Sequence, residues 1–251
     1  MLKYLDFFTS RSTLRNYSSE RQVSDEDLAA IIEAASHAPS TGNMQLYSVV
    51  ITRDKDMKKK LAPMHFNQPT VESASAVLTF CADFRRFEKW CECRNAAPGY
   101  DNFHSFVTAL IDAALVAQQF VTIAELNGIG CCYLGTVTYN AAGIAEILDL
   151  PSRVVPVVTL TVGYPAEGEF PPASDRLPVE AIIHKETYHD YRPESIDRYF
   201  AYKESLPDSA KFTAENGKET LAQVFTDIRY PRSLNEEVSQ TFADFIRKQG
   251  F

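Results

Sequence analysis

Two arginines four residues apart are the first candidates for chemistry. In the segment RSTLR, Arg11 and Arg15 enclose the hydroxyl residues Ser12 and Thr13. A guanidinium presents a planar fork of donors that suits a phosphate or a carboxylate, and hydroxyls add neutral donors. The segment therefore favours a small anion as ligand, although an ordinary solvated loop has the same composition.

A second candidate segment is the loop at residues 39–45. It contains the small polar residues Ser40, Thr41 and Asn43, and it suits either ligand binding or a plain helix-to-strand connection. The glycines between residues 128 and 135 do not form the dinucleotide-binding fingerprint, because their spacing differs and they follow a helix instead of opening one.

Metal, thiol and nucleic-acid chemistry have little support in the sequence. The five histidines show no metal-ligand spacing, and the cysteine pairs 91/93 and 131/132 are closer together than zinc-binding pairs usually are. No nucleophile-elbow pattern is present, although a single sequence leaves Ser/His/Asp or Cys/His catalysis open. Cys81 and Cys131 lie in apolar strands and are expected to be inert core thiols. The net charge of -8 argues against nucleic acid as a main partner.

These segments must be positioned by an unusually apolar helix at residues 102–127. Its apolar residues recur every three or four positions on one side, most of the other side is apolar too, and Asp112 and Glu125 are its only charges. About 25 residues at about 1.5 Å each give a rod of nearly 40 Å, which is longer than one domain needs. We expect a second copy of the chain to share this helix. A membrane span is the alternative, but polar residues interrupt every long apolar run.

The remaining pattern alternates strands with helices. Strands are expected at residues 46–52, 76–82, 130–135 and 154–162, a long loop at 165–175, and helices at 2–8, 24–37, 54–61, 84–90, 140–148, 194–203 and 235–248. This order predicts a layered α/β or α+β domain at residues 1–190, with residues 191–251 as a helical extension that cannot bury a core alone. No export signal is present, so a reducing cytoplasm is the expected location.

Taken together, these segments resemble the FMN-dependent nitroreductase superfamily. The closest match is its branch of oxygen-insensitive NAD(P)H nitroreductases and flavin reductases. The resemblance rests on RSTLRNYSSERQVSDEDLAAIIEAASHAPSTGNMQ, on Gln68 with VESASAVLTFCADF, on ELNGIGCCYLGTVTYN, on VVPVVTLTVGYPAE with the later RLP, and on FADFIRKQGF. It implies an α+β three-layer sandwich, with a mainly antiparallel sheet flanked by helices, built as an intertwined homodimer. It also implies ping-pong reduction of nitroaromatics, quinones or free flavin by NAD(P)H, with FMN in a cleft between the subunits.

The resemblance assigns cofactor contacts residue by residue. Matches to the surroundings of the FMN phosphate are Arg11, Ser12, Thr13 and Arg176, and Arg15 matches a cation near the pyrimidine edge of the ring. A loop over the flavin is matched by Ser40, Thr41 and Asn43. The pyrimidine partner is matched by Gln68, and the strand end near the flavin N5 by Leu134, Gly135 and Thr136. No side chain is implied as an essential acid or base, because the flavin carries the chemistry.

Three departures from the family pattern matter. Ser174-Asp175 replaces a usual Lys-Pro, and Thr136 replaces a second glycine. Residues 203–223 lack the arginine cluster that is associated with the 2′-phosphate of NADPH, and Lys203, Lys211 and Lys218 could replace it only as point charges. Either NADH or NADPH could therefore serve. Two alternative functions stay open. The chain could be a flavin enzyme of the same fold that catalyses reductive dehalogenation or flavin breakdown, or it could be a non-catalytic, flavin-binding dimeric interaction protein.

Overall fold

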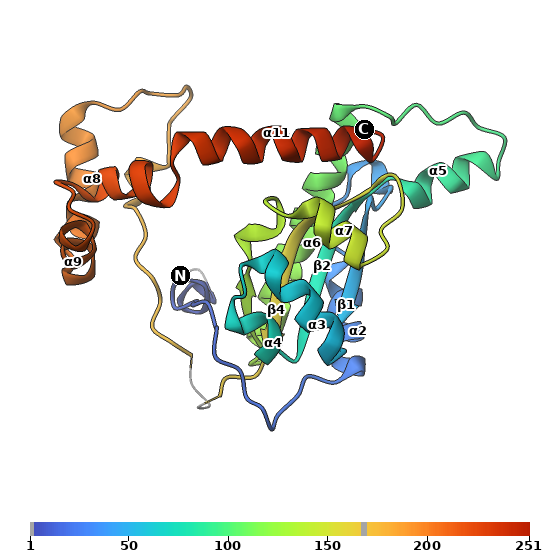
Figure 1. The fold of residues 1–251 in the computed structure, drawn as a ribbon, viewed down its shortest axis with the longest axis horizontal. Coiled ribbons are helices and arrows are strands. Elements are labelled where there is room, and N and C mark those ends of the chain that lie inside the picture. The colour runs from blue at the N-terminus through green and yellow to red at the C-terminus, as the bar shows by residue number, and fades with distance from the viewer. Residues whose placement is uncertain (1–2, 167–169) are drawn as a thin grey trace. The chain divides into compact units, whose positions relative to one another are not determined.

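The computed structural model describes residues 3–166 and 170–251, and the four predicted strands form one sheet within them (Figure 1). The strands are β1 (Tyr47–Thr52), β2 (Ala76–Asp83), β3 (Gly130–Tyr133) and β4 (Val154–Gly163), in the spatial order β1-β2-β4-β3. All three pairings are antiparallel. Of the predicted segments, Leu2 and residues 167–169 lie outside the described residues.

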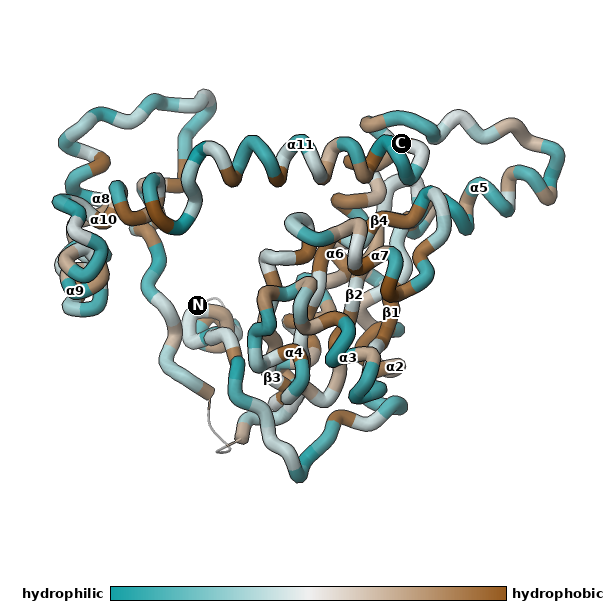
Figure 2. Tube along the Cα trace, in the orientation of Figure 1, coloured by the Kyte–Doolittle hydropathy of each residue, from teal (hydrophilic) through white to brown (hydrophobic). Residues whose placement is uncertain are grey.

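The sheet is covered by helices on both faces, which makes the fold the predicted α+β three-layer sandwich. On one face, α6 (Phe103–Leu126) packs against the strands, and α2 (Asp25–Ala35) packs against α6. The other face carries a smaller apolar cluster with residues from α3 (Lys55–Leu61), α4 (Pro69–Ser73) and α7 (Ala141–Ile147). Because both faces are covered, all eight residues of β2 are buried. Figure 2 shows apolar residues concentrated on the strands and on α6.

Local signals in the sequence explain where several helices begin and end. The Ser24 hydroxyl accepts a hydrogen bond from Asp27 N at 3.0 Å and caps α2, and Asn102 accepts one from Ser105 N at 3.1 Å and caps α6. Gly128, with φ of 74°, follows the end of α6 in the left-handed conformation that glycine tolerates. The other helices of this part of the chain are α1 (Leu5–Thr9) and α5 (Arg85–Glu92), with 3₁₀ turns at Thr41–Asn43, Ala62–His65 and Gly135–Val137.

The predicted long apolar helix at residues 102–127 is present as α6, and it packs against the sheet. By length and composition it is also the one helix of the described residues that could cross a membrane, but it packs on β2, β3 and β4. We therefore interpret it as a core helix. Its outer side leaves large apolar side chains exposed: Phe103, Ile111, Leu115 and Leu126.

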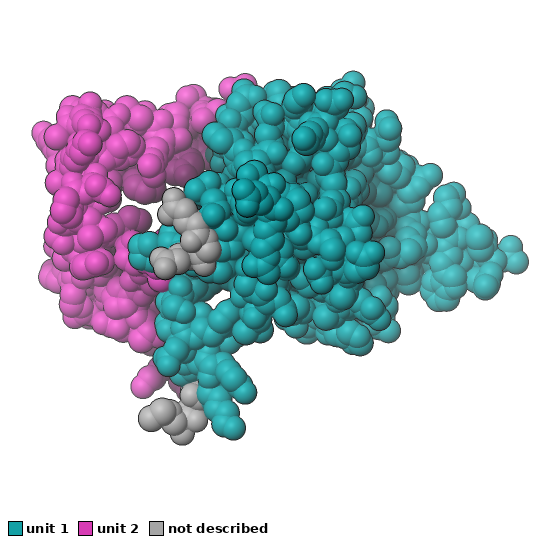
Figure 3. Space-filling model, turned by 90° about the horizontal axis from the view of Figure 1, so that it is seen from below, with its two compact units in different colours: residues 1–172, 238–251 teal, residues 173–237 magenta. Residues whose placement is uncertain are grey.

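The chain divides into two compact units (Figure 3). Residues 1–172 and 238–251 form the first, and residues 173–237 form the second. The second unit contains a 3₁₀ turn at Val179–Ala181, α8 (Pro193–Ser205), α9 (Pro207–Glu215), α10 (Leu221–Val224) and a π turn at Phe225–Arg229. The last helix, α11 (Arg232–Lys248), begins in the second unit, and its buried Phe245 and Ile246 belong to the main core. The extension proposed at residues 191–251 thus spans both units.

Candidate functional site

The arginine-bracketed segment lies against the edge strand β3. Leu14 N donates to Cys131 O at 3.2 Å, and the Leu14 side chain is buried directly over Gly130. A Cβ at Gly130 would lie 2.2 Å from Leu14 Cδ2, so only glycine permits this approach. The buried Leu14 thereby fixes its two neighbours, Thr13 and Arg15, which are more exposed.

Tyr17 anchors the other end of this segment. Its hydroxyl lies 2.9 Å from Thr161 O and 3.0 Å from Leu14 O, and burial raises the pKa of the phenol. The ring covers Gly163, where an added Cβ would lie 2.7 Å from Tyr17 Cδ1. Because Gly130 and Gly163 face each other across β3 and β4, two neighbouring glycines accommodate Leu14 and Tyr17.

Arg11 forms an ion pair with Glu125 near the C-terminal end of α6. Arg11 Nη2 lies 3.0 Å from Glu125 Oε1, and the Glu125 side chain is only 6% exposed. Oε1 nevertheless has no hydrogen-bond partner within the described residues, because the contact lacks hydrogen-bond direction. Burial raises the pKa of Glu125, and Arg11 opposes part of that rise. The guanidinium is thus held in place while its other donors stay available.

Unused donors and a cavity surround this segment. Ser12 Oγ is buried and has no hydrogen-bond partner in the part of the chain that the structure describes. Thr13 and Arg15 border a cavity of about 390 Å³, whose lining consists of Thr13, Leu14, Arg15, Asn16, Ala166, Phe170 and Pro171. Two guanidiniums, a buried hydroxyl and a cavity together suit an anionic group attached to a larger molecule.

The buried thiols of strands β2 and β3 are protonated. Burial raises the pKa of Cys132, against the lowering effect of Arg15 and Arg11, and it raises the pKa of Cys81 to about 12. Burial also holds the pKa of Cys131 well above its usual value. Thiols in this state are poor nucleophiles. Residues 3–166 and 170–251 also contain no group of three or more His, Cys, Asp or Glu that could hold a metal.

The turn after β3 brings Thr136 to a buried histidine. Leu134 N donates to Thr159 O at 2.9 Å, after which the chain turns through Gly135, and Thr136 Oγ1 lies 2.8 Å from His65 Nδ1. His65 is fully buried, and burial lowers its pKa to about 4, so its imidazole is neutral near pH 7.

His65 also links this turn to Gln68. Gln68 N donates to His65 O at 3.2 Å, so the backbones of the two residues are joined in one short turn. The structure therefore brings together two of the predicted contact groups, Gln68 and residues 134–136. Sequence reasoning missed His65, because a lone histidine without a spaced partner gives no usable signal.

The loop with Ser40, Thr41 and Asn43 is attached elsewhere on α6. Ser40 Oγ donates to Asp112 Oδ2 at 2.8 Å, near the middle of the helix, whereas Arg11 pairs with Glu125 near its end. Thirteen residues at about 1.5 Å each separate these two attachment points by about 20 Å. Within one chain, this loop and the arginine-bracketed segment therefore contact different parts of α6.

The last predicted phosphate contact, Arg176, belongs to the second compact unit. Its Nη1 donates to the backbone oxygens of Ser174 and Asp175 at 3.2 and 2.8 Å. Both acceptors are backbone oxygens, which any residues at these two positions would offer, so these bonds do not depend on the departure Ser174-Asp175.

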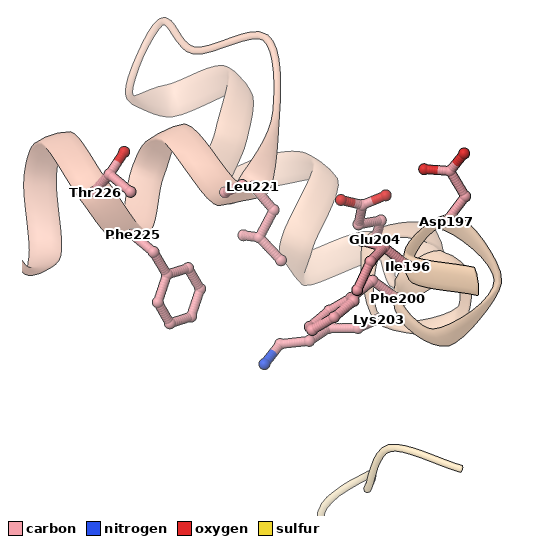
Figure 4. A pocket seen from close by; sticks show the side chains of 9 residues that line it. Ile196, Asp197, Phe200, Lys203, Glu204, Leu221, Phe225 and Thr226 are labelled. Atoms are coloured by element: carbon pink, nitrogen blue, oxygen red, sulfur yellow. The ribbon is translucent and has the colours of Figure 1, made fainter. Parts of the chain in front are cut away.

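The second unit also holds an apolar pocket of about 370 Å³ (Figure 4). Its walls include Phe200, Leu221 and Phe225, and Lys203 Nζ lies 5.3 Å from the centre of the Phe225 ring. The other two lysines considered for the nucleotide are paired with carboxylates: Lys211 with Glu215 at 3.8 Å and Lys218 with Asp227 at 2.8 Å.

Comparison with known proteins identifies the family. The model of the Nitroreductase family matches residues 8–164, which include the sheet and most of the predicted contacts. The chain belongs to this family. The resemblance read from the sequence and the fold class are therefore confirmed.

Individual relatives match over nearly the whole chain. An FMN reductase [NAD(P)H] of Bacillus subtilis is 30% identical, over 100% of this chain and 98% of its own. An oxygen-insensitive NADPH nitroreductase of Salmonella typhimurium is 28% identical, over 98% and 97%. A crystal structure from Bacteroides fragilis, described only as a candidate oxidoreductase, is 52% identical with a TM-score of 0.95, over 98% and 99%. The prediction that this nitroreductase-family chain is an oxidoreductase enzyme is confirmed.

Proposed function

We propose that this nitroreductase-family enzyme uses FMN to pass electrons from NAD(P)H to nitroaromatic compounds, quinones or free flavin. FMN is the cofactor and NAD(P)H the co-substrate, in line with the names of the full-length relatives. The observation that carries the proposal is the placement of the Arg11–Arg15 segment on β3, directly before the turn that contains Gly135. Donors for a phosphate and an open backbone approach for a flat ring thus lie on neighbouring segments.

The residues in this region fit FMN chemically. Arg11 and Arg15 supply positive charge, and the unpartnered hydroxyl of Ser12 supplies a donor that is already desolvated. No described atom lies within 4 Å of a Cβ placed on Gly135, so a ring has room to approach the backbone there. We propose that Arg11, Ser12 and Thr13 bind the phosphate, and the contact of Arg176 with it stays a prediction from the sequence.

The proposed roles of the remaining residues concern the ring. FMN, when bound, accepts hydride from the nucleotide and donates electrons to the acceptor. Arg15 would favour the electron-rich form of the ring by its positive charge, and Gln68 would bind the pyrimidine edge. The strand end at Leu134, Gly135 and Thr136 would present a backbone N–H to it, from Gly135 or Thr136, because Leu134 N is bonded to Thr159 O. Ser40, Thr41 and Asn43 would cover it, and solvent would supply the protons.

Two features support a homodimer as the active form. The exposed apolar side of α6 resembles a surface that a second copy covers, since soluble monomers rarely expose large apolar patches. In addition, the Ser40 loop and Arg11 attach to α6 about 20 Å apart in one chain, and a second subunit could supply its own loop to the first subunit's arginines. We propose an intertwined dimer with FMN in a cleft between subunits, acting in the cytoplasm by a ping-pong mechanism.

Anaerobic titration of the purified protein with NADH and then NADPH tests this function. We expect a flavin absorption band that either or both nucleotides bleach, and that a nitroarene or quinone restores. The comparison of the two titrations decides which nucleotide serves. Bleaching that nitroarenes, quinones and free flavin all fail to reverse would indicate a specialised reaction of the same fold. A protein that cannot be reconstituted with FMN would refute the proposal.

Replacing Gly135 by alanine is expected to weaken FMN binding by about tenfold or more while changing the stability of the apoprotein by less than about 0.5 kcal/mol. The added methyl group meets no described atom, but it would stand where the ring approaches the backbone. Fluorescence titration with FMN and urea unfolding measure the two effects. Gly99→Ala, which also meets nothing within 4 Å, is the matched control. Wild-type FMN affinity in Gly135→Ala would place the ring elsewhere.

A further inference from the structure

A buried carboxylate interrupts the apolar helix α6 near its middle. Asp112 is 1% exposed and lies between the core residues of this helix, such as Ala109 and Ala113. A buried ionised carboxylate is costly unless it is hydrogen-bonded, so the partners of Asp112 indicate what it is for. The proposed function so far gives this residue no role.

All three hydrogen bonds to Asp112 come from the loop at residues 40–46. Ser40 Oγ donates to Oδ2 at 2.8 Å, Thr41 N donates to Oδ1 at 3.0 Å, and Leu46 N donates to Oδ2 at 3.1 Å. Bonds to an ionised acceptor are stronger than those between neutral groups. Because the donors lie at both ends of the loop, the carboxylate closes the loop onto the helix.

The loop has a backbone that needs such support. Gly42, Asn43 and Gln45 all have positive φ, at 56°, 55° and 54°. Glycine adopts this region freely and asparagine tolerates it, but it strains Gln45. The bond from Gln45 N to Ser40 Oγ at 2.8 Å opposes that strain, and its acceptor is itself bonded to Asp112. Turn bonds from Asn43 N to Ser40 O and from Met44 N to Thr41 O also support the loop, as does Arg86, which donates to Gln45 O. The carboxylate thus adds the contacts that fix both ends of the loop to α6.

We propose that Asp112 is a positioning residue that holds the 40–46 loop in the conformation in which Ser40, Thr41 and Asn43 contact FMN. This inference rests on the proposed function, which assigns these three residues to the flavin. It explains why an otherwise apolar helix carries a charge at this point. The carboxylate acts on the flavin through the loop and does not need to touch it.

The variant Asp112→Asn removes the charge and one acceptor oxygen of the side chain while it keeps the shape of the side chain. Both oxygens of Asp112 accept hydrogen bonds, whereas an asparagine side chain has one oxygen and an NH₂ group. In either orientation the NH₂ group faces a donor of the loop, so at least one bond is replaced by a donor–donor contact. The volume of the side chain stays the same.

Two measurements on Asp112→Asn test the proposal. Amide hydrogen exchange of the apoprotein should become about tenfold faster or more at Thr41 and Leu46, while the amides of β2 keep wild-type rates. The Kd for FMN should rise by about tenfold or more. Asp56→Asn, which removes an exposed carboxylate on α3, is the matched control and should change neither quantity.

Unchanged exchange at Thr41 and Leu46 would overturn the proposal. Faster exchange with a wild-type Kd for FMN would overturn it too, while the proposed function would survive. A wild-type protein that binds no FMN would refute the proposed function and this inference with it. If Asp112→Asn does not fold, Ser40→Ala serves in its place on the apoprotein: it removes one of the three bonds and should speed exchange at Thr41 and Leu46 by a smaller factor.

Discussion

Replacing Arg11 by alanine is expected to weaken FMN binding by about tenfold or more and to destabilise the apoprotein by about 2 kcal/mol. The loss of affinity follows from the removal of a proposed phosphate donor. The loss of stability follows from Glu125, whose buried carboxylate is left without the guanidinium 3.0 Å away. FMN fluorescence titration and urea unfolding of the apoprotein measure the two losses separately.

The stability loss of Arg11→Ala should depend on pH. Burial raises the pKa of Glu125, and Arg11 lowers it, so removing Arg11 raises this pKa further. A carboxyl whose pKa is higher in the folded state binds its proton more tightly there, and its contribution to stability falls as the pH rises. The difference in unfolding free energy from wild type should therefore be largest near about pH 8 and shrink toward about pH 5.

Two controls separate the structural role of Arg11 from its proposed binding role. Arg53→Ala breaks a more exposed ion pair with Asp25 and should cost less than about 1 kcal/mol, with FMN affinity unchanged. The double variant Arg11→Ala/Glu125→Gln removes both charges, so stability should largely recover while FMN affinity stays low. Recovery of affinity in the double variant would show that Arg11 acts only on the fold.

Local patterns in the sequence predicted the elements that carry strong signals. The helices predicted to begin near Ser24 and Asn102 are confirmed, and apolar runs predicted the four strands. The short helices α4, α9 and α10 are not among the predicted helices, although Pro69 and Pro207 fit the first turn of a helix. The strand order β1-β2-β4-β3 depends on pairings between distant segments, which no local pattern specifies.

In the candidate site, too, local segments could be predicted from the sequence, whereas contacts between distant segments could not. The segments proposed to bind FMN could be located by their residue types and by resemblance. Their supporting contacts could not: Ser40 and Asp112 are 72 residues apart, and His65 and Thr136 are 71 apart. Asp112 and Glu125 were noticed only as charges on an apolar helix. Their partners become visible only when the loop and the arginine segment are folded onto α6.

Replacing Gly130 by alanine is expected to destabilise the protein by about 1–3 kcal/mol and to weaken FMN binding by about tenfold or more. The new Cβ would lie 2.2 Å from Leu14 Cδ2 and 2.5 Å from Leu14 Cβ, so Leu14 or the strand must move. The backbone of β3 is held by its pairing with β4, opposite Gly163. Leu14 therefore gives way, and it displaces the flanking residues Thr13 and Arg15.

Control variants separate the displacement of Thr13 and Arg15 from a simple loss of stability. Gly99→Ala is the matched control, because its Cβ meets nothing within 4 Å and should leave unfolding and FMN titration unchanged. The double variant Gly130→Ala/Leu14→Gly removes every Leu14 side-chain atom that the new Cβ would meet, but it leaves the arginine segment less anchored, so FMN affinity should recover only in part. Wild-type affinity in Gly130→Ala would mean that the position of the Arg11–Arg15 segment on β3 does not control FMN binding. The proposal that these arginines and hydroxyls hold the phosphate would then lose its structural basis.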